Sequence, residues 1–206
     1  LVPKVENAKQ LKAVDDKIQN LRKDCGRKEP VYLMPILESA KGILNSFEIA
    51  KASKNNVAIA IGLEDYTADI GVERTNQGRE SLFARSQVVN AARSAGIQAI
   101  DTVFSDVRDD VGLRLSVQEA KELGFDGKGC IHPRQIKPIH EEFAPSKTEI
   151  EKAKKIVLAF DIAEKKGLGV VSLGSKMIDP PVVKRALQTI DLAIATKLLN
   201  KNWKKN

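Results

Sequence analysis

The sequence predicts an α/β protein built on a parallel β-sheet, with the TIM (β/α)8 barrel as its architecture. Short apolar runs alternate with amphipathic stretches of helical length, which is the pattern of repeated βα units. The apolar runs lack strict alternation, as expected for strands that are covered on both faces. Five such units fill residues 1–144 at about 29 residues each, so the chain accounts for about five of the eight units of a barrel.

The predicted strands are short segments rich in Val, Ile and Leu. We expect them at Leu1–Val5, Val31–Leu37, Val57–Leu63, Gln98–Val103 and Gly129–His132.

The segments between these strands have the composition and spacing of amphipathic helices. Ser39 is a suitable N-cap for the second helix, and Gly96 follows the third helix where a left-handed residue is expected. The predicted helices are Ala8–Lys23, Ala40–Ala52, Gly78–Ala95 and Ser116–Leu123.

The βα pattern ends near Pro145, which divides the chain into a partial barrel at residues 1–144 and a helical extension at residues 145–206. The extension predicts a long helix, a Gly-rich link and a last helix that opens on a proline pair, which the first turn of a helix tolerates. These segments are Thr148–Lys165, Gly167–Gly174 and Pro180 to about Leu199.

The composition excludes several classes of protein. With 42% hydrophobic and 30% charged residues, the chain is typical of a globular domain rather than of a disordered one. Its longest apolar runs, such as residues 57–63, are far shorter than the roughly 20 residues of a membrane span. We expect no membrane segment and no export signal, and two distant cysteines, Cys25 and Cys130, favour a reducing cytoplasm.

The charge is distributed unevenly. All seven net positive charges lie in residues 145–206. This pattern favours either an acidic partner or simply a solvated helix face, and the charge alone does not decide between them. Because aromatic residues make up only 4% of the chain and no nucleic-acid motif is present, we do not expect a nucleic-acid partner.

Two carboxylates follow neighbouring predicted strands. Glu38 follows Val31–Leu37, and Asp65 follows Val57–Leu63. Since neighbouring parallel strands lie about 4.8 Å apart, these groups could hold one hard divalent cation, for which Mg²⁺ is suited. The alternative is that Glu38 caps the following helix and that Asp65 and Asp69 form a turn.

Other polar residues near strand ends have weaker signals. Lys4 could meet a substrate carboxylate or form a buried salt bridge with Glu6 or another acid. Asp101 could line a pocket, or it could be a carboxylate at a helix entry or in a loop. Asp179 stands before Pro180 and Pro181, where an N-cap is the simplest role. His132 is expected to be a hydrogen-bonded structural residue.

Eight segments in succession carry a resemblance over nearly the whole chain. They are Leu37–Ile43, Gly62–Tyr66, Glu73–Thr75, Leu82–Arg85, Ala91–Ala99, Leu123–Lys128, Ile131–Pro133 and Lys176–Asp179. In this order they resemble the citrate lyase β-subunit family, which is similar to the HpcH/HpaI aldolases.

The resemblance implies a TIM barrel in which Glu38 and Asp65 bind Mg²⁺. It implies cleavage of a citryl thioester on an acyl carrier protein to oxaloacetate and an acetyl thioester, with Asp179 protonating the enolate in a neighbouring subunit's site. Substrate would contact Glu38 and Asp65 and, from their positions at strand ends rather than from the resemblance, Lys4 and Asp101. The implied partners are this carrier protein or CoA, other citrate lyase subunits and further copies of the chain.

Two alternatives stay open at this point. One is a lyase or thioesterase for malyl-CoA or methylmalyl-type CoA esters, and the other is a non-catalytic subunit that binds an acidic carrier protein. The family's barrel opens with three further βα units, which bring an Arg-x-Asn strand whose arginine is expected to bind a substrate carboxylate. The same units bring an acidic strand end similar to Asp-Leu-Glu-Asp. Because neither this strand end nor the Arg-x-Asn strand occurs in this sequence, we expect a further segment upstream or on another chain to supply them.

Overall fold

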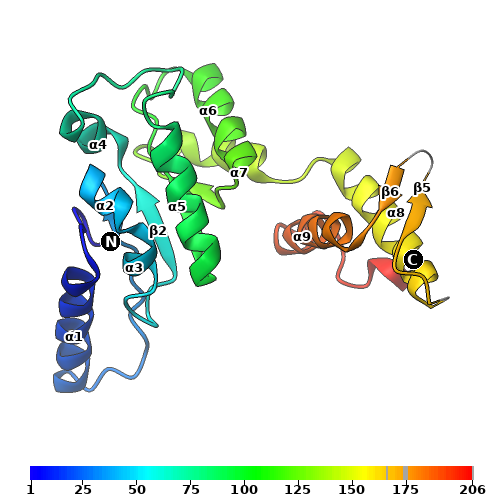
Figure 1. Cartoon of the computed structure of the whole chain (residues 1–206), viewed down its shortest axis with the longest axis horizontal. Helices are drawn as coiled ribbons and strands as arrows, with labels where there is room; N and C mark the ends of the chain where they lie inside the picture. The colour runs from blue at the N-terminus through cyan, green and yellow to red at the C-terminus, as the bar shows by residue number, and fades with distance from the viewer. Residues whose placement is uncertain (166, 174–175, 206) are drawn as a thin grey trace. The chain divides into compact units, whose positions relative to one another are not determined.

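The computed structural model describes residues 1–165, 167–173 and 176–205 (Figure 1). The chain forms two compact units, Leu1–Phe143 and Ala144–Asn206.

The first unit is organised around a four-stranded parallel sheet in chain order, β1-β2-β3-β4. Ile36 pairs with Ala60, and Ala60 pairs with Ile100. The predicted α/β class with a parallel sheet is therefore confirmed. The strands are β1 (Ile36–Leu37), β2 (Ala58–Ile61), β3 (Gln98–Asp101) and β4 (Gly127–Lys128).

The prediction of a strand at Leu1–Val5 is wrong in its extent. Val2 makes one parallel bridge to Pro35, and its carbonyl accepts the N–H of Ile36 at 2.8 Å. Lys4 then adopts a φ of 53°, which turns the backbone away from an extended course. The segment lies beside β1 without becoming a regular strand.

The predicted strand Gly129–His132 is also wrong, because the pairing lies two residues earlier. Gly127 pairs with Ile100, and Lys128 pairs with Asp101. The following residues enter a turn in which His132 Nδ1 accepts the N–H of Arg134, at the start of a 3₁₀ helix.

The helices of the first unit confirm the predicted alternation but change several boundaries. Ser39 Oγ accepts the N–H of Gly42 at 3.1 Å, and Gly96 has a φ of 70°, so both predicted caps are present. The predicted helix Ala40–Ala52 is two helices that meet at Asn45. The segment from residue 63 is a helix rather than a strand end and a turn. The elements are α1 (Ala8–Asp24), α2 (Ala40–Leu44), α3 (Ser46–Ala50), α4 (Leu63–Asp69), α5 (Leu82–Ala95), α6 (Asp110–Leu123), η1 (Pro133–Gln135) and α7 (Ile136–Phe143).

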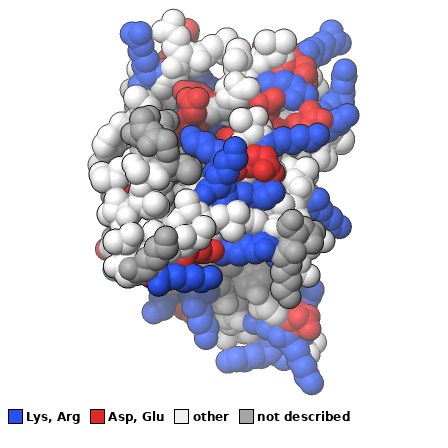
Figure 2. Space-filling model, turned by 90° about the vertical axis from the view of Figure 1, so that its right-hand side faces the viewer, with Lys and Arg blue, Asp and Glu red and all other residues white. Residues whose placement is uncertain are grey.

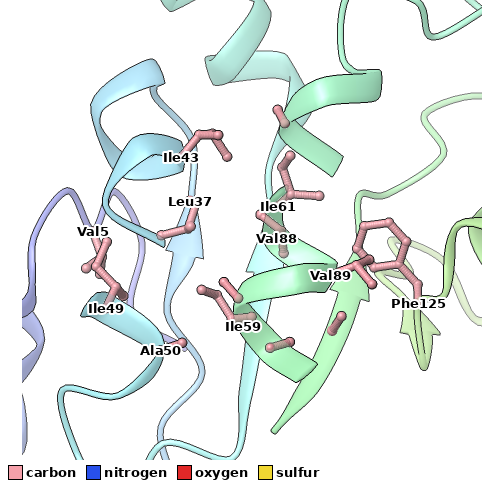
Figure 3. Packing of buried hydrophobic residues seen from close by; sticks show 14 of the residues in the cluster. Val5, Leu37, Ile43, Ile49, Ala50, Ile59, Ile61, Val88, Val89 and Phe125 are labelled. Atoms are coloured by element: carbon pink, nitrogen blue, oxygen red, sulfur yellow. The ribbon is translucent and has the colours of Figure 1, made fainter. Parts of the chain in front are cut away.

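The core of the first unit lies between the sheet and the helices that cover it (Figure 3). All four residues of β2 are buried, which explains why this strand shows no alternation in the sequence. Ile59 is fully buried, and Val88 of α5 belongs to the same cluster. The core fixes the ends of β1 and β2, where the candidate site lies.

The second unit is a pair of packed helices with a small hairpin. Ile156 and Val157 of α8 belong to one buried cluster with Val183 and Ile190 of α9. The predicted Gly-rich link contains an unpredicted strand, which pairs antiparallel with the next one, and Gly174 lies outside the described residues. The last helix ends at Ala195 rather than near Leu199. The elements are α8 (Lys147–Glu164), β5 (Val171–Leu173), β6 (Lys176–Ile178), α9 (Pro180–Ala195) and η2 (Trp203–Lys205).

The surface of the second unit is basic, in agreement with the net charge of residues 145–206. On the face that Figure 2 draws, Lys and Arg cover more of the surface than Asp and Glu do. None of the helices in the described ranges combines the length and the apolar character that a bilayer crossing requires.

Candidate functional site

The carboxyl ends of β1 and β2 open onto a cavity of about 300 Å³. Glu38 directly follows β1, and Asp65 lies in the first turn of α4, just after β2. The two carboxylates therefore reach the same cavity from neighbouring strands, as the sequence predicted. The lining residues are Lys4, Glu6, Glu38, Ser39, Asp65, Ala68 and Asp69.

Lys4 connects the two carboxylates. Its backbone N–H donates a hydrogen bond to Glu38 Oε2 at 2.9 Å, and its Nζ lies 3.1 Å from Asp65 Oδ1. The structure thus brings Lys4 into the site, where its salt bridge is with Asp65 rather than with Glu6 and is exposed rather than buried. The two side chains are 70% and 52% exposed, so this ion pair is a weak, solvated one.

The position of Glu38 depends on the glycine that follows β2. A Cβ atom at Gly62 would lie 2.7 Å from Glu38 Oε1 and 2.8 Å from its Cγ, which is closer than such atoms can approach. The absence of a side chain at this position is what leaves room for the Glu38 carboxylate beside β2.

The start of α4 is held by Thr102, the residue that directly follows β3. The Leu63 N–H donates to Thr102 Oγ1 at 3.2 Å, and both residues are buried. Because Leu63 begins the helix whose first turn carries Asp65, this hydrogen bond sets the height of that carboxylate over the sheet.

The donor set suits a hard cation that takes few protein ligands. Within the described ranges, neither Glu38 Oε1 nor Asp65 Oδ2 accepts a hydrogen bond from the protein. Of the other acids of the cavity, Glu6 has both oxygens occupied, by Ser39 and Lys41, and Asp69 Oδ2 accepts the Ala40 N–H. No group of three His, Cys, Asp or Glu residues arranged to hold a metal is found among the residues described. Two carboxylates with free oxygens meet the needs of Mg²⁺, which keeps several waters or substrate oxygens.

Asp101 lines a different and larger cavity of about 810 Å³ and is fully paired there. Its carboxylate accepts two hydrogen bonds from Arg85, at 3.1 and 3.0 Å, and one from Lys128 Nζ at 2.8 Å. All three side chains are buried. The structure therefore does not bring Asp101 together with Glu38 and Asp65.

Burial and charge act against each other in this cluster. Burial lowers the pKa of Lys128, and the attraction of Asp101 only partly offsets it. Burial also acts to lower the pKa of Arg85, but Asp101 and Glu119 raise it overall. Arg85 Nη1 lies 3.0 Å from Glu119 Oε2, so this arginine is held by two carboxylates.

Asp179 belongs to the other compact unit. Its Oδ1 accepts the Val182 N–H at 3.1 Å, which makes it the N-cap of α9, the simpler of the two predicted roles. His132 is a structural residue that caps η1.

The sequence analysis missed Lys128 and Gly62. Lys128 stands between two glycines. Because the predicted strand began at Gly129, Lys128 was not recognised as the last residue of a strand. Gly62 directly follows a fully apolar run, and a glycine at a strand end signals a close approach of another group.

Carboxylates line a cavity at the carboxyl edge of the parallel sheet, which is the place where α/β proteins commonly bind their ligands. Residues 1–133 match the family described as HpcH/HpaI aldolase/citrate lyase, and the chain belongs to this family. The predicted relationship to the citrate lyase β-subunits is thereby confirmed.

Individual relatives agree with this assignment. The chain is 44% identical over 187 residues to the citrate lyase subunit beta of Escherichia coli K12, covering 90% of this chain and 62% of the relative. It is 33% identical over 205 residues to the human mitochondrial citramalyl-CoA lyase, covering 96% and 60%. Thus it spans less than two thirds of the length of these relatives.

A solved structure shares the architecture. The CitE protein from Mycobacterium tuberculosis, crystallised with magnesium, acetoacetate and coenzyme A, is 27% identical to this chain, with a TM-score of 0.74. The match covers 92% of this chain and 66% of CitE.

Proposed function

We propose that the chain carries the Mg²⁺ site of a carbon–carbon lyase that cleaves citryl thioester, carried on an acyl carrier protein, into oxaloacetate and an acetyl thioester. The observation that carries the proposal is the cavity that Glu38 and Asp65 share, with one free oxygen on each carboxylate. The magnesium in the related CitE structure supports the choice of cation.

Each residue has a defined part in this proposal. Glu38 and Asp65 bind Mg²⁺, which when bound polarises the oxygen that becomes the keto group. Lys4, at the same cavity, binds a substrate carboxylate. Asp179 delivers the proton that converts the thioester enolate into the acetyl group. A contact of Asp101 with substrate stays a prediction, and its two oxygens are already bound to Arg85 and Lys128.

The substrate class is supported by the degree of similarity. Identity to the citrate lyase β-subunit is 44%, against 33% to the citramalyl-CoA lyase, which favours citryl over malyl-type substrates. The alternative to a thioester on the carrier protein is a CoA thioester. The coenzyme A in the CitE crystal structure supports this alternative. The proposed setting is a cytoplasmic complex with other citrate lyase subunits and further copies of this chain.

The proposed architecture is a TIM barrel to which this chain contributes about five βα units. Four parallel strands in chain order, with helices between them, agree with consecutive units of such a barrel. The match covers 62% of the length of the Escherichia coli relative, and the rest of that length would be enough for the remaining βα units of a barrel.

A coupled assay of oxaloacetate release tests the proposal directly. The intact protein is given citryl carrier protein, citryl-CoA or malyl-CoA, each with Mg²⁺ and with a chelator. We expect release from the citryl thioesters in the presence of Mg²⁺ only. Turnover in the chelator would refute the metal role, and no turnover with any substrate would favour a non-catalytic binding subunit.

Substituting Gly62 with alanine should displace Glu38 and weaken Mg²⁺ binding by about tenfold or more, while the fold is retained. The added Cβ would collide with the Glu38 side chain at 2.7–2.8 Å, and the glycine's φ of −111° is open to alanine. Isothermal titration calorimetry measures the affinity. Gly169→Ala is the control because nothing lies within 4 Å of a Cβ there, and an equal loss in both variants would contradict the role of Gly62.

The Asp179→Asn variant should slow turnover by about 10²–10⁴-fold, as for a lost general acid, and leave Mg²⁺ affinity unchanged. Asparagine caps helices as well as aspartate does, so the Val182 N–H keeps its acceptor and α9 stays stable. Steady-state rates and calorimetry separate the two effects. A normal rate in this variant would reduce Asp179 to a helix cap.

A further inference from the structure

Lys4 has an unusual backbone conformation. Its φ of 53° lies in the left-handed region, which lysine seldom adopts because of crowding around its Cβ. Such a conformation persists where surrounding contacts hold it. Here the backbone N–H of Lys4 is bound to Glu38 Oε2, so the strained residue is anchored to one of the two candidate metal ligands.

The side chain of the same residue reaches the other ligand. Lys4 Nζ lies 3.1 Å from Asp65 Oδ1, within the cavity that Glu38 and Asp65 line. The ammonium group thus places a positive charge beside Asp65, in the cavity that Glu38 also lines. A divalent cation bound by the same carboxylates would meet a like charge at this place.

We propose that the Lys4 ammonium competes with the divalent cation for Asp65 and changes partner when the cation binds. In the free site it neutralises Asp65. In the loaded site it is released toward the cavity, where it is available to a carboxylate of the substrate. This inference rests on the proposed function, since it assumes that Glu38 and Asp65 are the metal ligands.

The exchange requires little rearrangement. The hydrogen bond to Glu38 is donated by the backbone N–H of Lys4 and does not involve the lysine side chain. The Cα of Lys4 can therefore stay at the edge of the cavity while its four-carbon side chain moves. The side chains of Lys4 and Asp65 are both exposed to solvent, so the ion pair between them is easily broken. A single compact ammonium, unlike a planar guanidinium, can leave one oxygen and approach another without losing a paired geometry.

The inference predicts that Lys4→Met binds Mg²⁺ about 2–5-fold more tightly than the unsubstituted protein, which is the range expected from loss of one exposed ion pair. Methionine keeps the length and the left-handed strain but removes the charge. Isothermal titration calorimetry with MgCl₂ on the intact protein gives the affinities, and thermal melting confirms that each variant is folded.

Two further variants sharpen the measurement. Lys4→Arg keeps the charge and should bind Mg²⁺ no more tightly than the unsubstituted protein. Lys41→Met is the matched control, because Lys41 also makes an exposed 3.1 Å ion pair with an acid of this cavity, Glu6. It should change the affinity less than Lys4→Met does. The gain in Lys4→Met should also shrink at high NaCl concentration, since added salt screens the competing charge.

The outcomes separate this inference from the proposed function. An unchanged or weaker Mg²⁺ affinity in Lys4→Met overturns the exchange, even if the lyase reaction is found. An equal gain in Lys41→Met also overturns it, because general charge then explains the effect. Tighter binding in Lys4→Met alone supports the exchange, whether or not oxaloacetate is released. If Mg²⁺ does not bind the unsubstituted protein, both proposals fail.

Discussion

Replacing Asp101 with alanine should destabilise the first unit by about 3–5 kcal/mol, the usual cost of removing one partner from a buried ion pair. The carboxylate is inaccessible to solvent and is bound to Arg85 and Lys128, whose side chains are 4% and 2% exposed. Without it, two cations face each other in the interior, and of the two only Arg85 keeps a carboxylate partner among the residues that the structure describes, Glu119. Urea unfolding followed by circular dichroism measures the change.

The loss should depend on pH in a defined direction. Burial already lowers the pKa of Lys128, and without Asp101 this pKa falls further below that of an unfolded lysine. Between the folded and unfolded pKa values the unfolded chain binds more protons, so the stability of Asp101→Ala should rise as the pH increases toward about 10.5. The full destabilisation of Asp101→Ala is present at pH values below the pKa that Lys128 has in the folded variant.

The Lys128→Met variant provides the matched control. It removes one cation but leaves Asp101 with its two hydrogen bonds from Arg85, so a neutral buried pair remains. We expect a change within about 1.5 kcal/mol, or a gain, because a buried lysine is replaced by an apolar side chain of similar length. If Lys128→Met costs as much as Asp101→Ala, the lysine rather than the carboxylate holds the cluster together.

The sequence predicted the fold wherever the signal was local. Alternation of apolar and amphipathic stretches identified the α/β class, and Ser39 and Gly96 marked helix ends because their roles depend only on the adjacent backbone. The last strand was misplaced because its position is set by pairing with Ile100 and Asp101, far away in the chain. The helix Leu63–Asp69 was not predicted, because its seven residues are too few to show a helical period.

The site was predictable to the same extent. Glu38 and Asp65 could be placed together because the ends of neighbouring parallel strands meet at one edge of a sheet. The ion pairs of Asp101 could not be predicted, because Arg85 and Lys128 are 16 and 27 residues away. Arg85 reaches it from α5, and Lys128 reaches it through the pairing of β3 with β4. Neither the left-handed backbone of Lys4 nor its contact with Glu38 has a signature in the sequence.

The Asp65→Asn and Glu38→Gln variants should each lower kcat/KM for oxaloacetate release by about 10³-fold or more, which corresponds to about 4 kcal/mol of transition-state stabilisation. Each substitution keeps the shape of the side chain and removes the negative charge that a hard cation requires. The assay follows release from citryl thioester over a range of MgCl₂ concentrations, with calorimetry of Mg²⁺ binding beside it.

Asp69→Asn is the control because Asp69 lines the same cavity, yet its Oδ2 is already bound to the Ala40 N–H, which an amide oxygen can also accept. Its rate should stay within about tenfold of the unsubstituted protein. The double variant of Glu38 and Asp65 should be little worse than either single one, because residues that act as one unit lose their effect together. Additive losses would mean that the two carboxylates act separately, and full activity in either single variant would remove that residue from the metal site.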